Sequence, residues 1–210
     1  MSRFVVVAGG PSDDVVDRRL DPDSVVVAAD SGADRARRAG WPVHHLVGDL
    51  DSVTDAGLDH CSAHGAIVHR HRADKDATDL ELALDLAVRE GATEIEVVLD
   101  PGGRFDHLLV AAHVLASDAY AAVPVRAMVG DAVVTVVRGS RSVVGRVGAL
   151  LTLLAIGGPA RVSTTGLRFP LRGEWLQPTS GRGLSNELTA PAAVIDVADG
   201  VVLAIQPASA

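Results

Sequence analysis

Two aspartates at the end of one predicted strand are the first residues whose types and spacing suggest chemistry. Asp49 and Asp51 follow directly on residues 43–47, which we expect to form a buried strand. In an extended chain their side chains point to the same side, roughly 7 Å apart. Two carboxylates held this close raise each other's pKa unless a cation neutralises them. Since Mg²⁺ prefers oxygen ligands, the pair indicates a site where a hard cation meets a phosphate.

A second acidic group, at residues 74–81, marks the start of a predicted helix. Thr78 and Glu81 have the spacing of a capping box, in which each side chain bonds the other residue's backbone N–H. Asp79 then lies in the first helical turn, where the helix dipole favours negative charge. Lys75 precedes the helix and is placed to reach a phosphate. The other acids of this segment fit equally well as loop acids and a helix cap.

Residues 102–104, Gly-Gly-Arg, follow a predicted strand and open another predicted helix. Exposed N–H groups, a helix N-terminus and a guanidinium are typical of a phosphate cradle, although Gly-Gly before a helix is also a common plain turn. His107 lies in the same segment, whereas the other histidines show no zinc-site spacing. The sequence has no P-loop motif, which excludes a P-loop kinase, and no Gly-x-Ser-x-Gly motif of a hydrolase.

The apolar pattern of the first part of the chain predicts a scaffold for these groups. Short Val- and Leu-rich runs alternate with helical segments, and the predicted strands cover residues 3–8, 25–29, 43–47, 66–69 and 94–99. Such alternation is typical of a parallel sheet covered on both faces. Ligands bind beyond the carboxyl ends of such strands, where the candidate groups fall. We therefore predict an α/β domain with a mainly parallel, Rossmann-like sheet over residues 1–125, its last helix reaching about Tyr120.

From about residue 122 the pattern changes to short β-rich runs. The predicted strands cover residues 123–129, 132–137, 142–144, 149–156, 160–164, 194–197 and 201–205. Turns are expected where Gly, Ser and Pro gather, at residues 138–140, 157–159 and 199–200. We therefore predict an all-β sandwich domain over residues 126–210. Phe169 and the polar segment 183–187 stand out within it, either as a core aromatic and a polar turn or as part of a binding surface.

The composition narrows the classes of function. The net charge is −8 and no run of Lys or Arg occurs, which argues against a nucleic-acid-binding surface. The single cysteine, Cys61, excludes an intrachain disulfide and fits a reducing compartment. No apolar run has the length of a membrane span or a secretion signal. We therefore expect a cytoplasmic protein with no membrane partner.

Taken together, these segments resemble the thiamine pyrophosphokinase family. The matching segments occur in the family's order and span nearly the whole chain, at residues 30–34, 48–52, 74–81, 102–107, 165–171 and 185–187. The second, third and fourth segments are specific, whereas the last two are short. The resemblance implies ATP-dependent transfer of a diphosphate group to the hydroxyl of thiamine, which gives thiamine diphosphate and AMP.

The resemblance also implies roles for individual residues. Asp49, Asp51 and Asp79 would be the Mg²⁺ ligands and catalytic carboxylates, and Arg104 would hold the polyphosphate. A further set would bind ATP: Asp30, Ser31, Gly32, Lys75, Asp76, Thr78, Gly102, Gly103, Asp106 and His107. Thiamine would be bound by the C-terminal domain, through Phe169, Ser185 and Asn186. The family implies a homodimer whose active sites lie between subunits, so that Phe169 stacks on thiamine in the neighbouring subunit's site.

The chain departs from the family pattern at a few positions. The first segment usually reads Asp-Gly-Gly-Ala-Asn, whereas this chain has Ser31 and Asp34, and Asp34 would add negative charge near the nucleotide. Phe169 stands where Trp or Tyr is common, so stacking is kept but a polar contact of the ring is lost. Two alternatives stay open: a diphosphokinase for another hydroxymethyl heterocycle such as a pterin, and a non-catalytic nucleotide-binding regulator.

Overall fold

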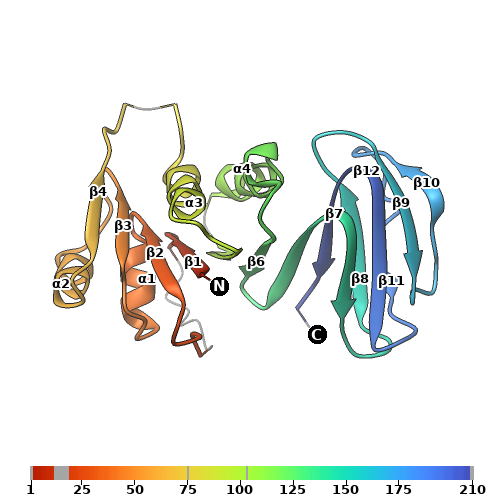
Figure 1. Cartoon of the computed structure of the whole chain (residues 1–210), viewed down its shortest axis with the longest axis horizontal. Coiled ribbons are helices and arrows are strands. Elements are labelled where there is room, and N and C mark those ends of the chain that lie inside the picture. The colour runs from red at the N-terminus through yellow and green to blue at the C-terminus, as the bar shows by residue number, and fades with distance from the viewer. Residues whose placement is uncertain (1, 12–18, 75, 103, 209–210) are drawn as a thin grey trace. The chain divides into compact units, whose positions relative to one another are not determined.

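The computed structural model describes residues 2–11, 19–74, 76–102 and 104–208, and its chain divides into two compact units. Unit 1 comprises Met1–Ala111 and Ala122–Gly130, and unit 2 comprises Ala112–Ala121 and Asp131–Ala210. Together they make a mixed α/β fold rich in sheet (Figure 1). This division differs from the expected boundary after residue 125, because the strand at residues 125–129 pairs within unit 1.

Unit 1 is built on a parallel sheet. Its strands are β1 (Arg3–Ala8), β2 (Val25–Ala29), β3 (His45–Gly48), β4 (Ile67–Arg70), β5 (Glu94–Leu99) and β6 (Val125–Val129). They lie in the order β6-β5-β1-β2-β3-β4, and each neighbouring pair is parallel. Because the strands run the same way, their carboxyl ends meet at one edge of the sheet.

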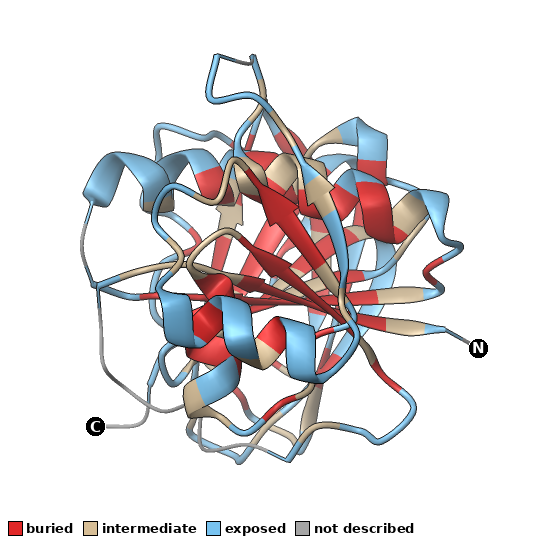
Figure 2. Ribbon diagram, turned by 90° about the vertical axis from the view of Figure 1, so that its left-hand side faces the viewer, coloured by how far each residue is buried: buried red, intermediate tan, exposed pale blue. Residues whose placement is uncertain are grey.

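The helices of the first part of the chain are α1 (Gly32–Arg38), α2 (Asp55–Ala63), α3 (Asp79–Arg89) and α4 (Phe105–Leu115). Thr78 and Glu81 form the expected capping box at the start of α3. Helix α4 ends earlier than expected, and a 3₁₀ helix, η1 (Asp118–Tyr120), follows with its first turn capped by the Ser117 hydroxyl. Figure 2 shows the buried strands of unit 1 with helices on both sides.

The core of unit 1 follows from the composition of its strands. Most Val and Ala residues of β1 and β2 are buried, as the near-continuous apolar runs predict for a sheet covered on both faces. Trp41, after α1, belongs to the same apolar cluster. This packing holds the strand ends that carry the candidate groups.

Unit 2 consists mainly of antiparallel strands. They are β7 (Ala132–Val144), β8 (Leu150–Ala155), β9 (Ala160–Thr165), β10 (Arg172–Leu176), β11 (Asn186–Glu187) and β12 (Ala192–Gln206). Strands β10, β9, β12 and β7 are neighbours in that order, while β8 pairs with β11 and β12. A separate apolar cluster that includes Leu151, Leu188 and Ile195 fills this unit.

Two segments of unit 2 that were expected to be turns lie within long strands. Gly139 and Gly200 have φ angles of 69° and 80°, which suit glycine, and the chain continues as strand through both positions. The register of β12 shifts near Gly200, so β12 pairs with β9 before the shift and with β8 after it. Strand β10 was not expected, because its sequence Arg-Gly-Glu-Trp-Leu lacks an apolar run.

No helix in the described part of the chain is both long and apolar enough to cross a bilayer.

Candidate active site

Three carboxylates meet at the carboxyl edge of the unit 1 sheet. Asp30 directly follows β2, Asp49 directly follows β3, and Asp79 is the first residue of α3. One carboxylate oxygen from each lies within 4.8 Å of the others, and all three residues are half-buried. Among the residues that the structure describes, this is the only group of three or more metal-ligating side chains. Its oxygen donors suit a hard divalent cation.

The backbone brings these carboxylates together. The Asp30 N–H donates a hydrogen bond of 2.8 Å to the Val47 carbonyl, which joins the ends of β2 and β3. Gly48 has a φ angle of 148°, and a Cβ on it would lie 3.2 Å from both the Asp79 carboxylate and the Asp30 Cβ. Glycine at this position therefore allows the aspartates to approach one another.

The surroundings of Asp30 disfavour the ionised form of its carboxyl group. Burial is the main cause that raises the pKa of the Asp30 carboxyl above its ordinary value, and the nearby Asp79 and Asp49 add to this effect. Hydrogen bonds from the Ser52 hydroxyl and the Ser31 backbone N–H act in the opposite direction. A bound cation would favour the ionised form of these acids, because an opposite charge lowers a carboxyl pKa.

Asp51 does not lie in this group, contrary to the side-by-side arrangement expected for Asp49 and Asp51. Leu50 between them has a φ angle of 68°, so the backbone is not extended there. The Asp51 side chain is exposed, and the Asp51 N–H donates to the Asp49 carboxylate at 3.3 Å. Asp30, assigned from the sequence to the nucleotide, occupies the third position. The signal for it was its place at the end of the strand next to β3.

The segment after β2 packs closely against the end of β1. A Cβ on Gly32 would lie 1.9 Å from the Val7 carbonyl oxygen, so only glycine fits at this position. Asp34 is buried, and its carboxylate accepts hydrogen bonds from the Thr54 N–H, at 3.0 Å, and from the Thr54 hydroxyl. Asp34 therefore joins α1 to the start of α2, which corrects the expectation that its charge faces the nucleotide.

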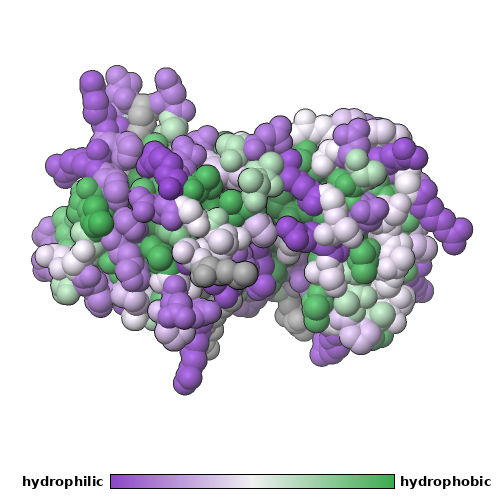
Figure 3. Space-filling model, viewed as in Figure 1, coloured by the Kyte–Doolittle hydropathy of each residue, from purple (hydrophilic) through white to green (hydrophobic). Residues whose placement is uncertain are grey.

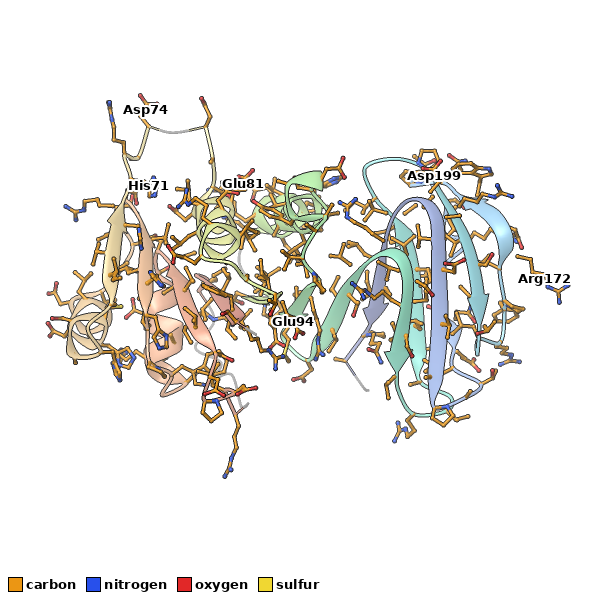
Figure 4. The ribbon with its side chains drawn as sticks, in the orientation of Figure 1. His71, Asp74, Glu81, Glu94, Arg172 and Asp199 are labelled. Atoms are coloured by element: carbon orange, nitrogen blue, oxygen red, sulfur yellow. The ribbon has the colours of Figure 1, made fainter. Side chains whose placement is uncertain are left out.

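The loop between β4 and α3 is polar and extends away from the sheet. Figure 4 labels Asp74 on this loop and Glu81 on α3, and Figure 3 shows hydrophilic side chains covering the loop. Asp74 and Asp76 are exposed and lie outside the carboxylate group. Lys75, expected to reach a phosphate, lies outside the described residues.

The segment after β5 presents an exposed guanidinium. Arg104 donates to the Asp106 carboxylate at 2.6 and 3.2 Å, and both side chains are largely exposed. The hydrogen bond from Arg104 lowers the pKa of Asp106 to about 2. The Gly102 N–H donates to the buried Asp100 carboxylate at 2.8 Å, which shapes the turn. His107 is exposed, and Gly103 lies outside the described residues.

The residues expected to bind thiamine lie together in unit 2. Phe169 is 61% exposed on the loop between β9 and β10. The guanidinium carbon of Arg168 lies 5.5 Å from the centre of the Phe169 ring. Ser185 is exposed with a φ angle of 53°, whereas the neighbouring Asn186 is buried. The Asn186 amide bonds to the backbone of Phe169 on both sides of that residue.

Comparisons with known proteins point to one family. The sequence model described as "Thiamin pyrophosphokinase, catalytic domain" matches residues 16–126. The thiamine pyrophosphokinase of Bacillus subtilis (strain 168) is 32% identical over 111 residues, which cover 52% of this chain and 52% of that protein. The sequence match thus spans about half the length of that curated relative.

Solved structures resemble the whole chain. A crystal structure of thiamine pyrophosphokinase from Bacillus subtilis has a TM-score of 0.86 at 22% identity and covers 100% of both chains. One from Geobacillus thermodenitrificans has a TM-score of 0.82 at 27% identity and covers 100% of this chain and 99% of that one. At 22% identity, the likeness to the Bacillus subtilis structure shows the fold of this chain. Because the catalytic-domain model matches more than half of the sequence, the chain belongs to the thiamin pyrophosphokinase catalytic-domain family.

Proposed function

We propose that this protein transfers a diphosphate group from ATP to the hydroxyl of thiamine and so produces thiamine diphosphate and AMP. The observation that carries the proposal is the group formed by Asp30, Asp49 and Asp79, at the sheet edge where α/β proteins bind ligands. Membership of the thiamin pyrophosphokinase family supplies the identity of the substrates.

Asp30, Asp49 and Asp79 would hold Mg²⁺, because their carboxylate oxygens are close enough to share one ion. Asp51, exposed beside Asp49, would add negative charge at the rim of the same site. When bound, Mg²⁺ supplies charge neutralisation for the phosphate groups whose bonds change. Arg104 would leave Asp106 and bind the polyphosphate, since both partners are exposed and free to turn.

The reaction needs few groups beyond these. The thiamine hydroxyl oxygen attacks the β-phosphorus of ATP, and the bond from that phosphorus to the oxygen bridging to the α-phosphate breaks. AMP leaves with that oxygen, and the hydroxyl proton passes to a carboxylate, which we assign to Asp79. Most of the rate then comes from position and from charge stabilisation.

We assign ATP binding to the loops around this edge. The residues would be Asp30, Ser31 and Gly32 after β2, Asp76 and Thr78 before α3, and Gly102, Asp106 and His107 beside α4, together with Lys75 and Gly103 in the undescribed positions. Unit 1 would act as a Rossmann-like nucleotide domain, with its functional boundary near residue 125. This assignment is supported by the parallel pairing of its strands.

We assign thiamine binding and dimerisation to the β-rich part of the chain, as a β-sandwich domain over residues 126–210. Phe169 would stack on the thiamine ring bound by the neighbouring subunit, with Ser185 beside it. A 61% exposed phenylalanine supports this assignment, because a ligand ring that covers it removes apolar surface from water. We place the enzyme in the cytoplasm, with thiamine and ATP as its small-molecule partners.

Mass spectrometry of the products from ATP, Mg²⁺ and thiamine tests the proposal. We expect thiamine diphosphate and AMP in equal amounts, and no product without the metal. Turnover of a hydroxymethylpterin in place of thiamine would show that the acceptor has been misassigned. ATP binding without AMP from either acceptor would instead show a nucleotide-binding regulator.

A further inference from the structure

The Asn186 side chain forms hydrogen bonds with the backbone of Phe169. Its Oδ1 accepts hydrogen bonds from the Phe169 N–H, at 3.0 Å, and from the Glu187 N–H, at 2.9 Å. Its Nδ2 donates to the Phe169 carbonyl at 2.7 Å. Both acceptor positions of the amide oxygen are therefore used within the protein, and the side chain is 6% exposed.

The strand pairing explains why a side chain makes these bonds. Leu167 and Leu188 face each other as an antiparallel bridge, and the Arg168 N–H donates to the Glu187 carbonyl at 2.9 Å. Two residues further along this register, Phe169 faces Asn186. Ser185, with its φ angle of 53°, turns the chain away at this point. The amide of Asn186 thus continues the pairing where backbone pairing ends.

The rest of the loop is held equally firmly. At its far end the Leu171 N–H donates to the Thr164 hydroxyl at 2.9 Å, and the Thr164 N–H donates to the Leu171 carbonyl at 2.9 Å. Beside Asn186, Glu187 binds the Arg168 guanidinium at 3.0 and 3.1 Å. The exposed Phe169 ring is therefore carried by a backbone fixed on both sides.

We propose that Asn186 is a positioning residue, which fixes the backbone of Phe169 so that its ring is preorganised to stack on the substrate ring, and that Asn186 does not contact thiamine itself. This inference rests on the proposed function of Phe169 and revises the role that the family resemblance implies for Asn186. Preorganisation matters here because a ring on a mobile loop loses conformational freedom when a ligand binds.

A double-mutant cycle separates positioning from direct contact. Asn186→Ala, Phe169→Ala and the double variant are compared by the KM for thiamine and the KM for ATP. Loss of one aromatic contact corresponds to roughly a two- to tenfold rise in the KM for thiamine. We expect each single variant to show such a rise with the KM for ATP unchanged, and the double variant to resemble Phe169→Ala alone. Multiplying effects in the double variant would show that Asn186 contacts thiamine independently.

Amide hydrogen exchange gives a readout that does not depend on activity. In Asn186→Ala we expect the Phe169 N–H to exchange at least about tenfold faster, while the Leu171 N–H keeps its rate. Ser163→Ala is the matched control, because it removes a side-chain acceptor elsewhere in the same hairpin, where the Ser163 hydroxyl accepts the Gly173 N–H at 2.9 Å. An unchanged rate at Phe169 would overturn the inference.

The test also covers a variant that does not fold and a wild-type protein that shows no turnover. If Asn186→Ala does not fold, Asn186→Asp replaces it, because this variant keeps the size of the side chain and an acceptor oxygen, while a carboxyl oxygen replaces the Nδ2 donor to the Phe169 carbonyl. If the wild-type protein does not turn over thiamine, the proposed function has failed, and hydrogen exchange alone decides whether Asn186 fixes Phe169.

Discussion

The carboxylates of Asp30, Asp49 and Asp79 lie close together, with one oxygen of each within 4.8 Å of the others. The burial of Asp30 and the repulsion from Asp79 and Asp49 raise the pKa of the Asp30 carboxyl. Repulsion among these carboxylates lowers the stability of the folded protein when no cation is bound. A bound cation removes the repulsion and so stabilises the folded protein.

Asp79→Asn should therefore separate activity from stability. We expect turnover to fall at least about 100-fold, because a metal ligand and the proton acceptor are lost together. The rise of the thermal midpoint on addition of Mg²⁺ should shrink, because one of the proposed Mg²⁺ ligands is lost. Calorimetric scans with and without Mg²⁺ measure this, with Asp85→Asn on the exposed face of α3 as the control. A full Mg²⁺-dependent shift in Asp79→Asn would contradict the assignment.

Arg104 and Asp106 form an exposed pair that a phosphate would have to break. The guanidinium holds the pKa of the Asp106 carboxyl at about 2, below its ordinary value of 3.8. In Arg104→Gln we expect this pKa to return toward 3.8, and in the wild-type protein we expect it to rise when ATP binds. Carboxyl ¹³C NMR titration measures both changes. A pKa that ignores ATP would show that Arg104 stays on Asp106 and does not bind the polyphosphate.

A pair of imidazoles links β3 and β4. The His45 Nδ1 lies 3.0 Å from the His69 Nε2. Burial lowers the pKa of both rings below 6.5. The charges of His69 and His44 lower the pKa of His45 further, against Glu90, which raises it. For His69 the charges of Arg89 and His71 lower the pKa, again against Glu90. As the pH falls, the unfolded chain therefore binds protons at these histidines at a higher pH than the folded chain does.

This pair predicts how stability depends on pH. Because the folded pKa values are lowered, the contribution is fully present above about pH 6.5 and is lost as the pH falls through the folded pKa values. We expect the free energy of unfolding to fall between pH 7 and pH 5, with a shallower slope in His69→Gln. Urea unfolding at a series of pH values measures the two slopes, and equal slopes would show that the pair does not titrate in this way.

Predictions for helices and strands differed in outcome according to whether they depended on neighbouring residues or on pairing with distant strands. The capping box at Thr78 and Glu81 was predicted from local spacing, and α3 begins there, because a cap depends on neighbouring residues only. Strands β7 and β12 were each predicted as separate shorter strands, because the segments around Gly139 and Gly200 were expected to be turns. In the structure both glycines have positive φ angles within a continuous strand. Continuous pairing with partner strands carries both through these glycines, and pairing is not visible in local sequence.

The molecule as a whole is proposed to work as a homodimer, with the carboxylates of unit 1 in one subunit acting on thiamine held by Phe169 of the other. A variant that loses a catalytic carboxylate and a variant that binds thiamine weakly then complement each other, because a mixed dimer contains one site with neither substitution.

Mixing Asp79→Asn with Phe169→Ala tests this arrangement. After subunit exchange at equal concentrations, with thiamine well below its KM, we expect the mixed dimers to add roughly a quarter of the wild-type activity, because half of the dimers are mixed and each has one intact site. The unmixed variants give the baseline, and size-exclusion chromatography gives the oligomeric state. Activity that never exceeds the baseline, in a mixture shown to exchange subunits, would place each site within one chain.

The sequence by itself determined the alternation of strands and helices, the caps and the acidic segments, because these depend on burial periodicity and on near neighbours. Tertiary structure alone decided which acids meet. Strand order places β2 beside β3 and brings Asp30 to Asp49, while the φ angle of Leu50 turns Asp51 away. Asn186 likewise reaches Phe169 only through the pairing of distant segments. The direction of a side chain depends on single backbone angles and on distant neighbours, neither of which a local pattern records.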